Sequence, residues 1–169
     1  FCLSQDSREP EVITEGTVFR AKRIATISSC DLGGLGSIIQ CRKLARSADL
    51  VHLHSPWPFG DFLVLFLPKS VPIVVTYHSD ILKQTVLKFL YYPLRWIISL
   101  RAERFVATSL NYKASSHFLR SKIVTRKLMV IPLTTRAPAE AVREPIEVKK
   151  DFCLGENFVL FVGAHRYYK

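Results

Sequence analysis

The sequence predicts an α/β protein whose core is a doubly wound parallel β-sheet. Segments rich in Val, Ile and Phe alternate with segments of helical apolar spacing along most of the chain, and this order is typical of strand–helix–strand units. The strand segments are apolar without a break, which favours a sheet that is covered on both faces. Polar side chains follow the ends of these segments, so we expect a site at one edge of the sheet.

Residues 71–75 form the clearest of these strands and run directly into polar side chains. Branched residues such as Val and Ile are stiff at χ1 and suit a pleated strand. In open α/β sheets, ligands bind just beyond the carboxyl ends of the strands. Thr76, Tyr77, His78 and Asp80 would gather at that point, and the candidate site is therefore placed there.

The length and composition fit one globular domain. A chain of 169 residues with 49% hydrophobic and 22% charged residues can bury a substantial core but cannot form two full domains. Charges and prolines interrupt its longest apolar stretches, so none is expected to span a membrane. The chain has neither an initiator Met nor a basic-then-apolar leader. We therefore expect no export, and a start inside a longer protein.

Four cysteines are scattered along the chain without any C-x-x-C spacing. This distribution argues against a disulfide framework and against a thiolate metal site. It predicts reduced thiols in a cytoplasmic protein. The four residues are Cys2, Cys30, Cys41 and Cys153.

The net charge of +10 is concentrated in residues 81–130, which hold ten basic residues and a single acid, Glu103. Such a patch attracts phosphate, nucleic acid or an anionic membrane surface. The alternative is a set of solvated helix faces that Lys and Arg keep soluble. Charge alone does not decide between them.

The first 46 residues predict only short elements. Residues 1–16 lack an apolar period and are expected to form a loop, followed by strands at 18–20 and 24–27. Glycines within 33–36 precede a helix at 38–46, a combination that can bind phosphate at a helix N-terminus. Their spacing matches neither G-x-G-x-x-G nor G-x-x-x-x-G-K-[ST], so we interpret them as a loop with Ser37 as the N-cap.

Residues 49–53 predict the next strand, which two prolines end. Because a strand has a period of two, His52 and His54 point to the same face. Zinc hydrolases use such H-x-H pairs, and a metal here would recruit His78 from the neighbouring strand. No acid or third His follows nearby in hydrolase-like spacing. The alternative is that His52 is a hydrogen-bonded residue facing a helix.

Residues 81–102 predict a long helix that Pro93 divides or kinks. Its apolar stripe is expected to be mostly core. The helix also mixes cations with amphipathic aromatic residues, a composition suited to a membrane interface. These residues are Lys88, Tyr91, Tyr92, Arg95 and Trp96. The other expected elements are helices at 59–67 and 111–121 and strands at 104–108 and 127–131.

The amino-acid composition of the chain changes after residue 133. Residues 134–156 are rich in Pro, Ala and scattered charge, which is typical of a linker. Residues 158–163 then predict a strand that has no partner strands in this sequence. Since one strand cannot form a core, we expect the chain to stop just inside a second domain.

Five short motifs follow one another between residues 48 and 169. They are ADLVHLHSP at 48–56, VTYHSD at 75–80, ATS at 107–109, VIPL at 130–133 and FVG with RYYK at 161–169. In order and spacing, the set resembles the bacterial family 4 glycosyltransferases. Each motif alone is weak, so the specificity of the resemblance lies in the ordered set.

The resemblance implies a two-domain GT-B enzyme. Residues 1–133 would form the Rossmann-like, acceptor-side N-terminal domain without its first strand or strands. Residues 134–156 would be the interdomain linker, and 157–169 the start of the C-terminal donor-binding domain. The implied reaction transfers a hexosyl or mannosyl group from a nucleotide-sugar donor to a glycan or lipid-linked acceptor. Anomeric configuration would be retained, in polysaccharide biosynthesis.

The resemblance implies no cofactor and no catalytic metal, because fixed positive charge aimed at the departing diphosphate can replace a cation. His78 matches the histidine that faces the donor sugar and the reacting centre, and it is the catalytic candidate. Lys169 matches the diphosphate-binding lysine, with Arg166 as a second donor diphosphate-binding candidate. The acceptor or cleft candidates at neighbouring strand ends are His54, Tyr77, Asp80 and Ser109.

The sequence departs from the family pattern at several points. Thr134 stands where the family usually has Gly, and Ala164 stands where an Arg commonly follows the Val-Gly pair, which leaves Arg166 to compensate. The family's N-terminal glycine loop would lie upstream of Phe1, and the E-x-x-x-x-x-x-x-E element of the donor domain is absent from the sequence. We therefore expect this polypeptide alone to be inactive.

Two other functions stay open on the residues alone. A metal-dependent hydrolase would use His52, His54 and His78 as ligands, and a non-catalytic binding module would use only the basic window 81–130. No recognisable RNA or DNA motif accompanies that window. We therefore expect an anionic membrane surface or a lipid-linked acceptor as partner, not nucleic acid, and a location peripheral to the cytoplasmic face of the membrane.

Overall fold

The computed structural model describes residues 1–4, 11–13, 16–27, 30–80, 85–134, 151–152 and 159. The chain divides into two compact units, Phe1–Pro132 and Leu133–Lys169. All helices and strands given below belong to the first unit, which is described by itself. Of the predicted strand 158–163 only residue 159 is described, and nearly all of the predicted linker lies outside the described residues, so both stay predictions.

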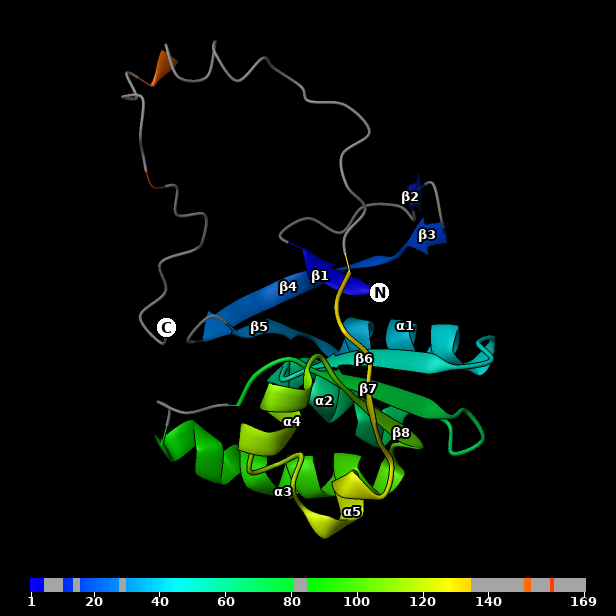
Figure 1. Cartoon of the computed structure of the whole chain (residues 1–169). Coiled ribbons are helices and arrows are strands. Elements are labelled where there is room, and N and C mark those ends of the chain that lie inside the picture. Colours follow the sequence, from blue (N-terminus) through cyan, green and yellow to red (C-terminus); the bar gives the residue numbers. More distant parts are fainter. Residues whose placement is uncertain are drawn as a thin grey trace. The chain divides into compact units, whose positions relative to one another are not determined.

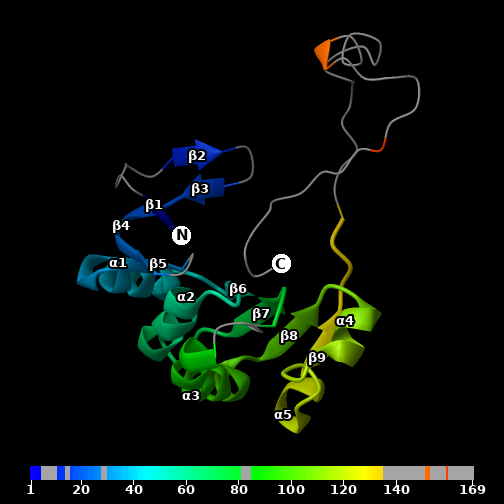
Figure 2. The ribbon, with the colours of Figure 1, turned by 90° about the vertical axis from the view of Figure 1, so that its left-hand side faces the viewer.

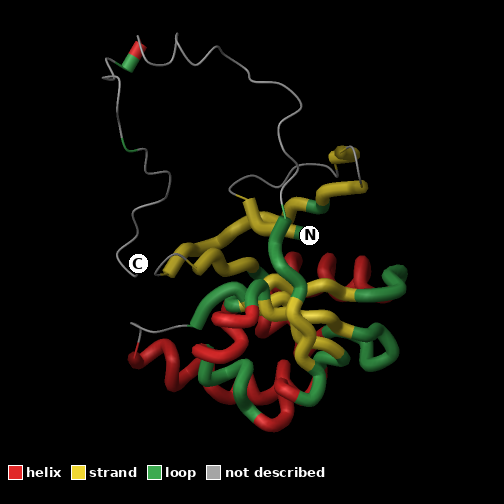
Figure 3. The backbone as a smooth tube through the Cα atoms, viewed as in Figure 1, coloured by secondary structure: helices red, strands yellow, loops and turns green. Residues whose placement is uncertain are grey.

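A four-stranded parallel sheet forms the centre of the first unit. Its strands are β6 (Val51–Ser55), β7 (Ile73–Tyr77), β8 (Arg104–Ala107) and β9 (Leu128–Val130), in that order across the sheet. All three pairings are parallel. Figures 1 and 2 show β6, β7 and β8 beside one another, Figure 2 also labels β9 next to β8, and Figure 3 shows the helices in red among the yellow strands. The predicted α/β class with a Rossmann-like parallel sheet is confirmed.

The helices of this unit begin and end close to the ends of the strands they join. The first helix, α1 (Leu35–Arg46), precedes β6. The short α2 (Pro58–Leu63) and the 3₁₀ turn η1 (Val64–Phe66) link β6 to β7. The long α3 (Thr85–Arg101) links β7 to β8 and continues through Pro93. The last two helices, α4 (Leu110–Ser115) and α5 (Lys122–Thr125), precede β9.

One face of the sheet carries the hydrophobic core. Because side chains alternate along a strand, the in-register row Leu53, Val75, Phe105 and Leu128 points to a single face. The next row toward the carboxyl ends is Ser55, Tyr77, Ala107 and Val130. Residues of η1, α3 and α5 pack against these rows, and Figures 1 and 2 show α3 and α5 together on one side of the sheet.

The opposite face of the sheet is more polar. It carries His52 and His54 on β6 and Thr76 on β7. Val106 and the half-exposed Met129 continue the His54 row across β8 and β9. The two faces of the same strands are therefore used differently, one for packing and the other for polar side chains.

The loop predicted for residues 1–16 is wrong, because three short strands form there or at its end. They are β1 (Cys2–Ser4), β2 (Glu11–Ile13) and β3 (Gly16–Val18). The first pairs with β4 and the other two pair with each other. β1 and β4 lie apart in the sequence, and all of these short segments lack the apolar period that would have indicated a strand.

The strands predicted at 18–20 and 24–27 are instead mostly one strand, β4 (Arg20–Ile27), which pairs antiparallel with β5 (Cys30–Gly33). Asp31 on β5 accepts hydrogen bonds from Thr26 Oγ1 at 2.6 Å and from an Arg23 guanidinium nitrogen at 3.1 Å. These cross-strand contacts stabilise a pairing that hydrophobic spacing alone does not predict.

The prediction that Ser37 is an N-cap is also wrong, since the N-cap of α1 is Gly34 and Ser37 is buried in the first turn. A Cβ placed on Gly33 would lie 2.5 Å from Ser37 Oγ. This close approach requires glycine at position 33. The glycine run therefore allows the chain to pack tightly as it enters α1.

The single helix predicted at 111–121 is wrong in its extent, because α4 ends at Ser115 and a turn separates it from α5. Ser116 is buried, and its hydroxyl accepts a hydrogen bond from the backbone N–H of Leu119 at 3.3 Å. A serine hydroxyl that bonds to the local backbone competes with helical hydrogen bonding. This bond favours the turn over a continuous helix.

Several residues of the basic window serve the fold. Lys127 Nζ donates to the carbonyl oxygens of Ser99, Leu100 and Ala102, at the C-terminal end of α3. The Arg101 guanidinium donates to the carbonyl oxygens of Pro68 and Val71. Cations at a helix C-terminus satisfy free carbonyl groups and the helix dipole. Part of the positive charge of this window is therefore structural.

Among the described residues, no helix combines the length and the hydrophobicity needed to cross a membrane.

Phe105 tests the position of the core, because its side chain is fully buried and packs edge-on against the ring of Phe118. We expect Phe105→Ala to lower the free energy of unfolding by ~3–5 kcal/mol, the usual cost of deleting a buried aromatic side chain. Leu110→Ala is the matched control, since Leu110 is 70% exposed, and its effect should stay within about 0.5 kcal/mol. Urea denaturation measures both, and equal effects would contradict the assigned core.

Candidate functional site at the carboxyl ends of β6 and β7

The carboxyl ends of β6 and β7 are joined by their backbones. The two strands pair in register from Val51 with Ile73 to Ser55 with Tyr77. One residue further on, the backbone N–H of His78 donates to the carbonyl oxygen of Ser55 at 2.8 Å. The strand pairing therefore extends to His78, the catalytic candidate.

This pairing brings His54 and His78 together on the polar face of the sheet. His54 Nδ1 lies 2.8 Å from His78 Nε2, and the rings stack with centroids 5.1 Å apart. The ring of His52 lies 4.7 Å from that of His54, and His52 Nε2 lies 2.7 Å from Thr76 Oγ1. The expectation that His52 and His54 share a face is confirmed. We call His54 and His78 the histidine pair.

The electrostatics of the site favour the neutral forms of His52 and His78. Burial lowers the pKa of His78, and the neighbouring His54 and His52 lower it further. Burial also lowers the pKa of His52, with a contribution from His54. A neutral imidazole has one N–H donor and one acceptor nitrogen. Two neutral rings can therefore share the hydrogen bond of the histidine pair, which two protonated rings could not.

No group of three or more His, Cys, Asp or Glu side chains in the described part of the chain is arranged to hold a metal ion. Three of the ring nitrogens of the three histidines already face protein partners, His52 Nε2 toward Thr76 and His54 Nδ1 and His78 Nε2 toward each other. The hydrolase alternative, in which all three histidines bind one metal, has no ligand set among these residues.

Tyr77 and Asp80 were both predicted to line the cleft, but the structure uses them differently. The Tyr77 side chain is fully buried in the core, between the rings of Tyr112 and Phe118. Its hydroxyl donates to Asp80 Oδ1 at 3.2 Å. Tyr77 therefore contacts the site from the core face of the sheet, through its bond to Asp80. Burial of its side chain raises the pKa of its hydroxyl.

Asp80 is held between β7 and α3. Besides the bond from Tyr77, its carboxylate lies 3.8 Å from the Arg95 guanidinium. Arg95 in turn lies over the ring of Phe118, 4.4 Å from its centroid. These contacts fix the segment that follows the histidine pair.

Ser109 lies at the carboxyl end of β8, the strand next to β7. It is the N-cap of α4, and its hydroxyl accepts a hydrogen bond from the backbone N–H of Tyr112 at 3.0 Å. Its side chain is thus engaged in capping. Arg166 and Lys169, the predicted diphosphate ligands, lie outside the described residues and stay predictions.

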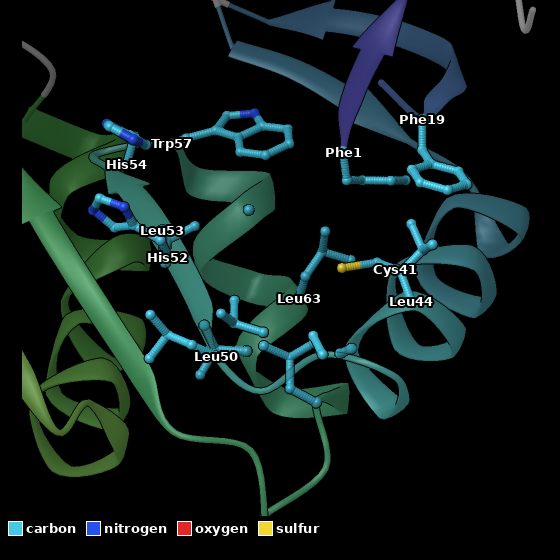
Figure 4. Close-up of a pocket in the computed structure, with 16 residues that line it drawn as sticks. Phe1, Phe19, Cys41, Leu44, Leu50, His52, Leu53, His54, Trp57 and Leu63 are labelled. Carbon is cyan, nitrogen blue, oxygen red and sulfur yellow. The ribbon is translucent and has the colours of Figure 1, made fainter. Parts of the chain in front are cut away.

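An apolar cavity of about 430 Å³ opens beside β6. Figure 4 shows Phe1, Phe19 and Leu44 at one end of this cavity, and His54 and Trp57 at the other. The cavity borders the edge of the sheet, because β6 is the first strand in the order β6-β7-β8-β9. An apolar space therefore adjoins the polar strand ends.

The structure also shows a functional candidate that the sequence analysis missed, the fully buried Asp61 of α2. Asp61 Oδ2 accepts hydrogen bonds from Ser55 Oγ at 3.1 Å, from the Trp57 backbone N–H at 3.3 Å, and from the Tyr91 hydroxyl. Burial raises the pKa of Asp61 to about 7. The sequence offered only a weak signal, a single acid inside an apolar helical segment.

With this geometry established, comparison with known proteins identifies the class. Residues 1–133 match the model of the family described as Glycosyltransferase Family 4. The match covers well over half of the chain, and the chain therefore belongs to glycosyltransferase family 4. The resemblance inferred from the ordered motifs is confirmed.

Two curated proteins are similar over nearly the whole chain. D-rhamnosyltransferase WbpZ of Pseudomonas aeruginosa is 36% identical over 167 residues, which cover 99% of this chain and 44% of that protein. O-antigen chain mannosyltransferase C of Escherichia coli is 34% identical over 178 residues, covering 100% of this chain and 45% of that protein. The chain thus spans less than half the length of either relative. No solved structure matches it.

The raised pKa of Asp61 predicts a pH dependence of stability. In the unfolded chain the carboxyl titrates near its ordinary value of 3.8, and in the folded protein near 7. The folded protein therefore holds an extra proton between these values, so the contribution of Asp61 to stability is full below pH 3.8 and is lost as the pH rises to 7. The loss amounts to roughly 4 kcal/mol.

The test compares wild type with Asp61→Asn by urea unfolding between pH 4 and 7.5. The stability of wild type relative to the variant should fall with rising pH, because only wild type carries the titrating carboxyl. His52 and His78 have lowered pKa values and titrate in both proteins, so their contributions appear in both stability curves. Asp49→Asn, at an exposed position, is the matched control for replacing a carboxyl group by an amide. A flat difference for Asp61→Asn would contradict the buried carboxyl.

Proposed function

We propose that the whole protein is a retaining glycosyltransferase that acts without a cofactor or catalytic metal. It would transfer a sugar from a nucleotide-sugar donor to a glycan or lipid-linked acceptor in polysaccharide biosynthesis. The observation that carries the proposal is the histidine pair at adjacent strand ends, in a chain that belongs to glycosyltransferase family 4. The carboxyl ends of parallel strands are where ligands bind in this type of sheet.

The histidine pair suits recognition of a sugar hydroxyl. When His54 Nδ1 donates to His78 Nε2, the remaining N–H of a neutral His78 is at Nδ1, and when the direction of the bond is reversed, His78 Nδ1 is an acceptor. His54 thus sets which group His78 offers to a ligand. In this proposal His78 contacts the donor sugar at the reacting centre, and His54 fixes the tautomer of His78.

The donor sugar is proposed to have the manno configuration. The names of the two relatives specify transfer of D-rhamnose and of mannose, and D-rhamnose is 6-deoxy-D-mannose. Both sugars share the arrangement of hydroxyl groups around the ring and differ at C6. A site that recognises the axial 2-hydroxyl would accept both of them and discriminate against glucose, because an unpaired polar group in a site is costly.

The donor diphosphate is assigned to Arg166 and Lys169, in line with the motifs at the end of the chain. Positive charge held where negative charge develops on the leaving diphosphate lowers the barrier without a metal ion. In this proposal His54, Asp80 and Ser109 lie along the acceptor side of the cleft, with Tyr77 supporting them from the core.

The second part of the proposal concerns location, at an anionic membrane surface on the cytoplasmic side. Tyr92, Trp96 and Leu100 follow one another every fourth residue on α3, and they are 69%, 57% and 49% exposed. Residues four apart lie on one face of a helix, and aromatic side chains of this kind favour the membrane interface. Tyr91 and Arg95, also expected at a membrane, face the core instead.

In the full-length protein, His78→Ala should lower the rate of transfer from nucleotide-activated mannose by about 10²-fold or more, since a group at the reacting centre is removed. The assay contains a chelator, which should leave wild-type turnover unchanged. His117→Ala is the matched control, because His117 is exposed on the loop between α4 and α5. A folded His78→Ala protein with wild-type turnover would contradict the proposed function.

The membrane proposal predicts that Tyr92→Ser combined with Trp96→Ser weakens binding of the full-length protein to vesicles rich in anionic lipid, by at least about tenfold. Added salt should weaken wild-type binding, because surface charges are screened. Leu110→Ser replaces an exposed hydrophobic residue that is 70% exposed on α4, and it should bind like wild type. Sedimentation with vesicles measures all three proteins, and unchanged binding of the double variant would refute this role for α3.

A further inference from the structure

A buried polar cluster lies beneath the carboxyl end of β6, on the core face of the sheet. Its centre is Asp61 Oδ2, which receives hydrogen bonds from three separate places in the chain: Ser55 at the end of β6, Trp57 in the following turn, and Tyr91 on α3. Ser55 Oγ also lies 3.4 Å from the Tyr91 hydroxyl. The cluster therefore ties the end of β6 to two helices.

The same Ser55 connects this cluster to the histidine pair. Its side chain points into the core to Asp61, while its carbonyl oxygen accepts the backbone N–H of His78 at 2.8 Å. Ser55 also follows His54 directly in the chain. A movement of Ser55 would therefore displace both members of the pair, whose hydrogen bond of 2.8 Å tolerates little change in geometry.

Stability alone does not account for this cluster. Asp61 Oδ1 has no hydrogen-bond partner among the described residues although the side chain is fully buried, and an unpaired buried polar atom costs free energy. The raised pKa of Asp61 has the same origin, since burial disfavours the charged carboxylate. The cluster is therefore costly to bury, while its three hydrogen bonds fix the position of the end of β6.

We propose that Asp61 is a positioning residue that holds the histidine pair in place through Ser55, with Tyr91 anchoring the carboxylate to α3. This inference rests on the proposed function only in treating the histidine pair as the reacting site. Two further groups interact electrostatically with Asp61. Burial raises the pKa of Asp61 and Arg95 of α3 opposes this rise, while burial, with a contribution from Asp61, raises the pKa of Cys30 of β5.

The experiment uses the full-length protein with ¹⁵N-labelled histidine and follows the ring resonances of His54, His78 and His117. Asp61→Asn and Ser55→Ala should both shift the His54 and His78 resonances and leave those of the exposed His117 unchanged. Asp49→Asn is the matched control for the first variant, and it should leave all three residues unchanged. A purely structural cluster would lower stability without moving the resonances of the pair.

Kinetics supply the second readout. Misplacement of a reacting group by a fraction of an ångström to one ångström can lower the rate by up to about 10²-fold. We therefore expect kcat to fall by about 10- to 100-fold in Asp61→Asn and Ser55→Ala, with KM for the donor changed by less than about threefold. The positioning role would be overturned if, in these variants, kcat fell and KM for the donor rose by the same factor while the ring resonances of the histidine pair did not move.

Two outcomes separate this inference from the proposed function. Unmoved His54 and His78 resonances in a folded variant would overturn the inference, whatever the activity of His78→Ala. Full transfer by His78→Ala would overturn the proposed function, while the resonance shifts would still establish that Asp61 positions the pair. If Asp61→Asn does not fold, the His54 and His78 resonances of Ser55→Ala test the inference instead. This variant removes the hydrogen bond from Ser55 to Asp61 and leaves the carboxylate in place.

Discussion

The parallel pairing of β6 with β7 is the interaction on which the rest of the site depends. Its register places Leu53 beside Val75 in the core and His54 beside Thr76 on the opposite face. A shift by one residue would exchange the two faces, sending histidines into the core and apolar side chains outward. The backbone bond from His78 to Ser55 closes the pairing at the point where the polar residues begin. One register therefore determines both the core and the histidine pair.

The two faces of these strand ends have complementary roles. On one face the histidine pair and His52 form a row of rings beside Thr76. On the other face, Tyr77 and the Asp61 cluster fix the strand ends to the helices. A single neutral hydrogen bond contributes only about 1 kcal/mol, so rigidity at this point comes from many buried bonds acting on the same few residues. Reactive groups held in this way lose little freedom when a substrate binds.

The sequence predicted the parts of the fold that depend on continuous apolar strands. β6, β7, β8 and β9 all occur near their expected positions, and the ordered motifs at their ends indicated the family. Strands were expected at 18–20 and 24–27, but β1, β2 and β5 were not, because these are short segments without an apolar period and the pairing of β4 with β5 relies on polar contacts to Asp31. Tyr77 follows Ile73 and Val75 at a period of two, so alternation along β7 places it on the core face; it was predicted to line the cleft because polar residues stand on both sides of it in the sequence. Asp61 was missed because its partners Ser55 and Tyr91 are distant in sequence.

The central claim is that the carboxyl ends of β6 and β7 bind the sugar that is transferred. The most direct test is a crystal structure of the full-length protein with a nucleotide-activated mannose. The claim predicts the sugar ring in contact with the His78 side chain, within about 4 Å, with the His54–His78 hydrogen bond intact. A sugar bound elsewhere, with His78 free of any contact to it, would contradict the claim.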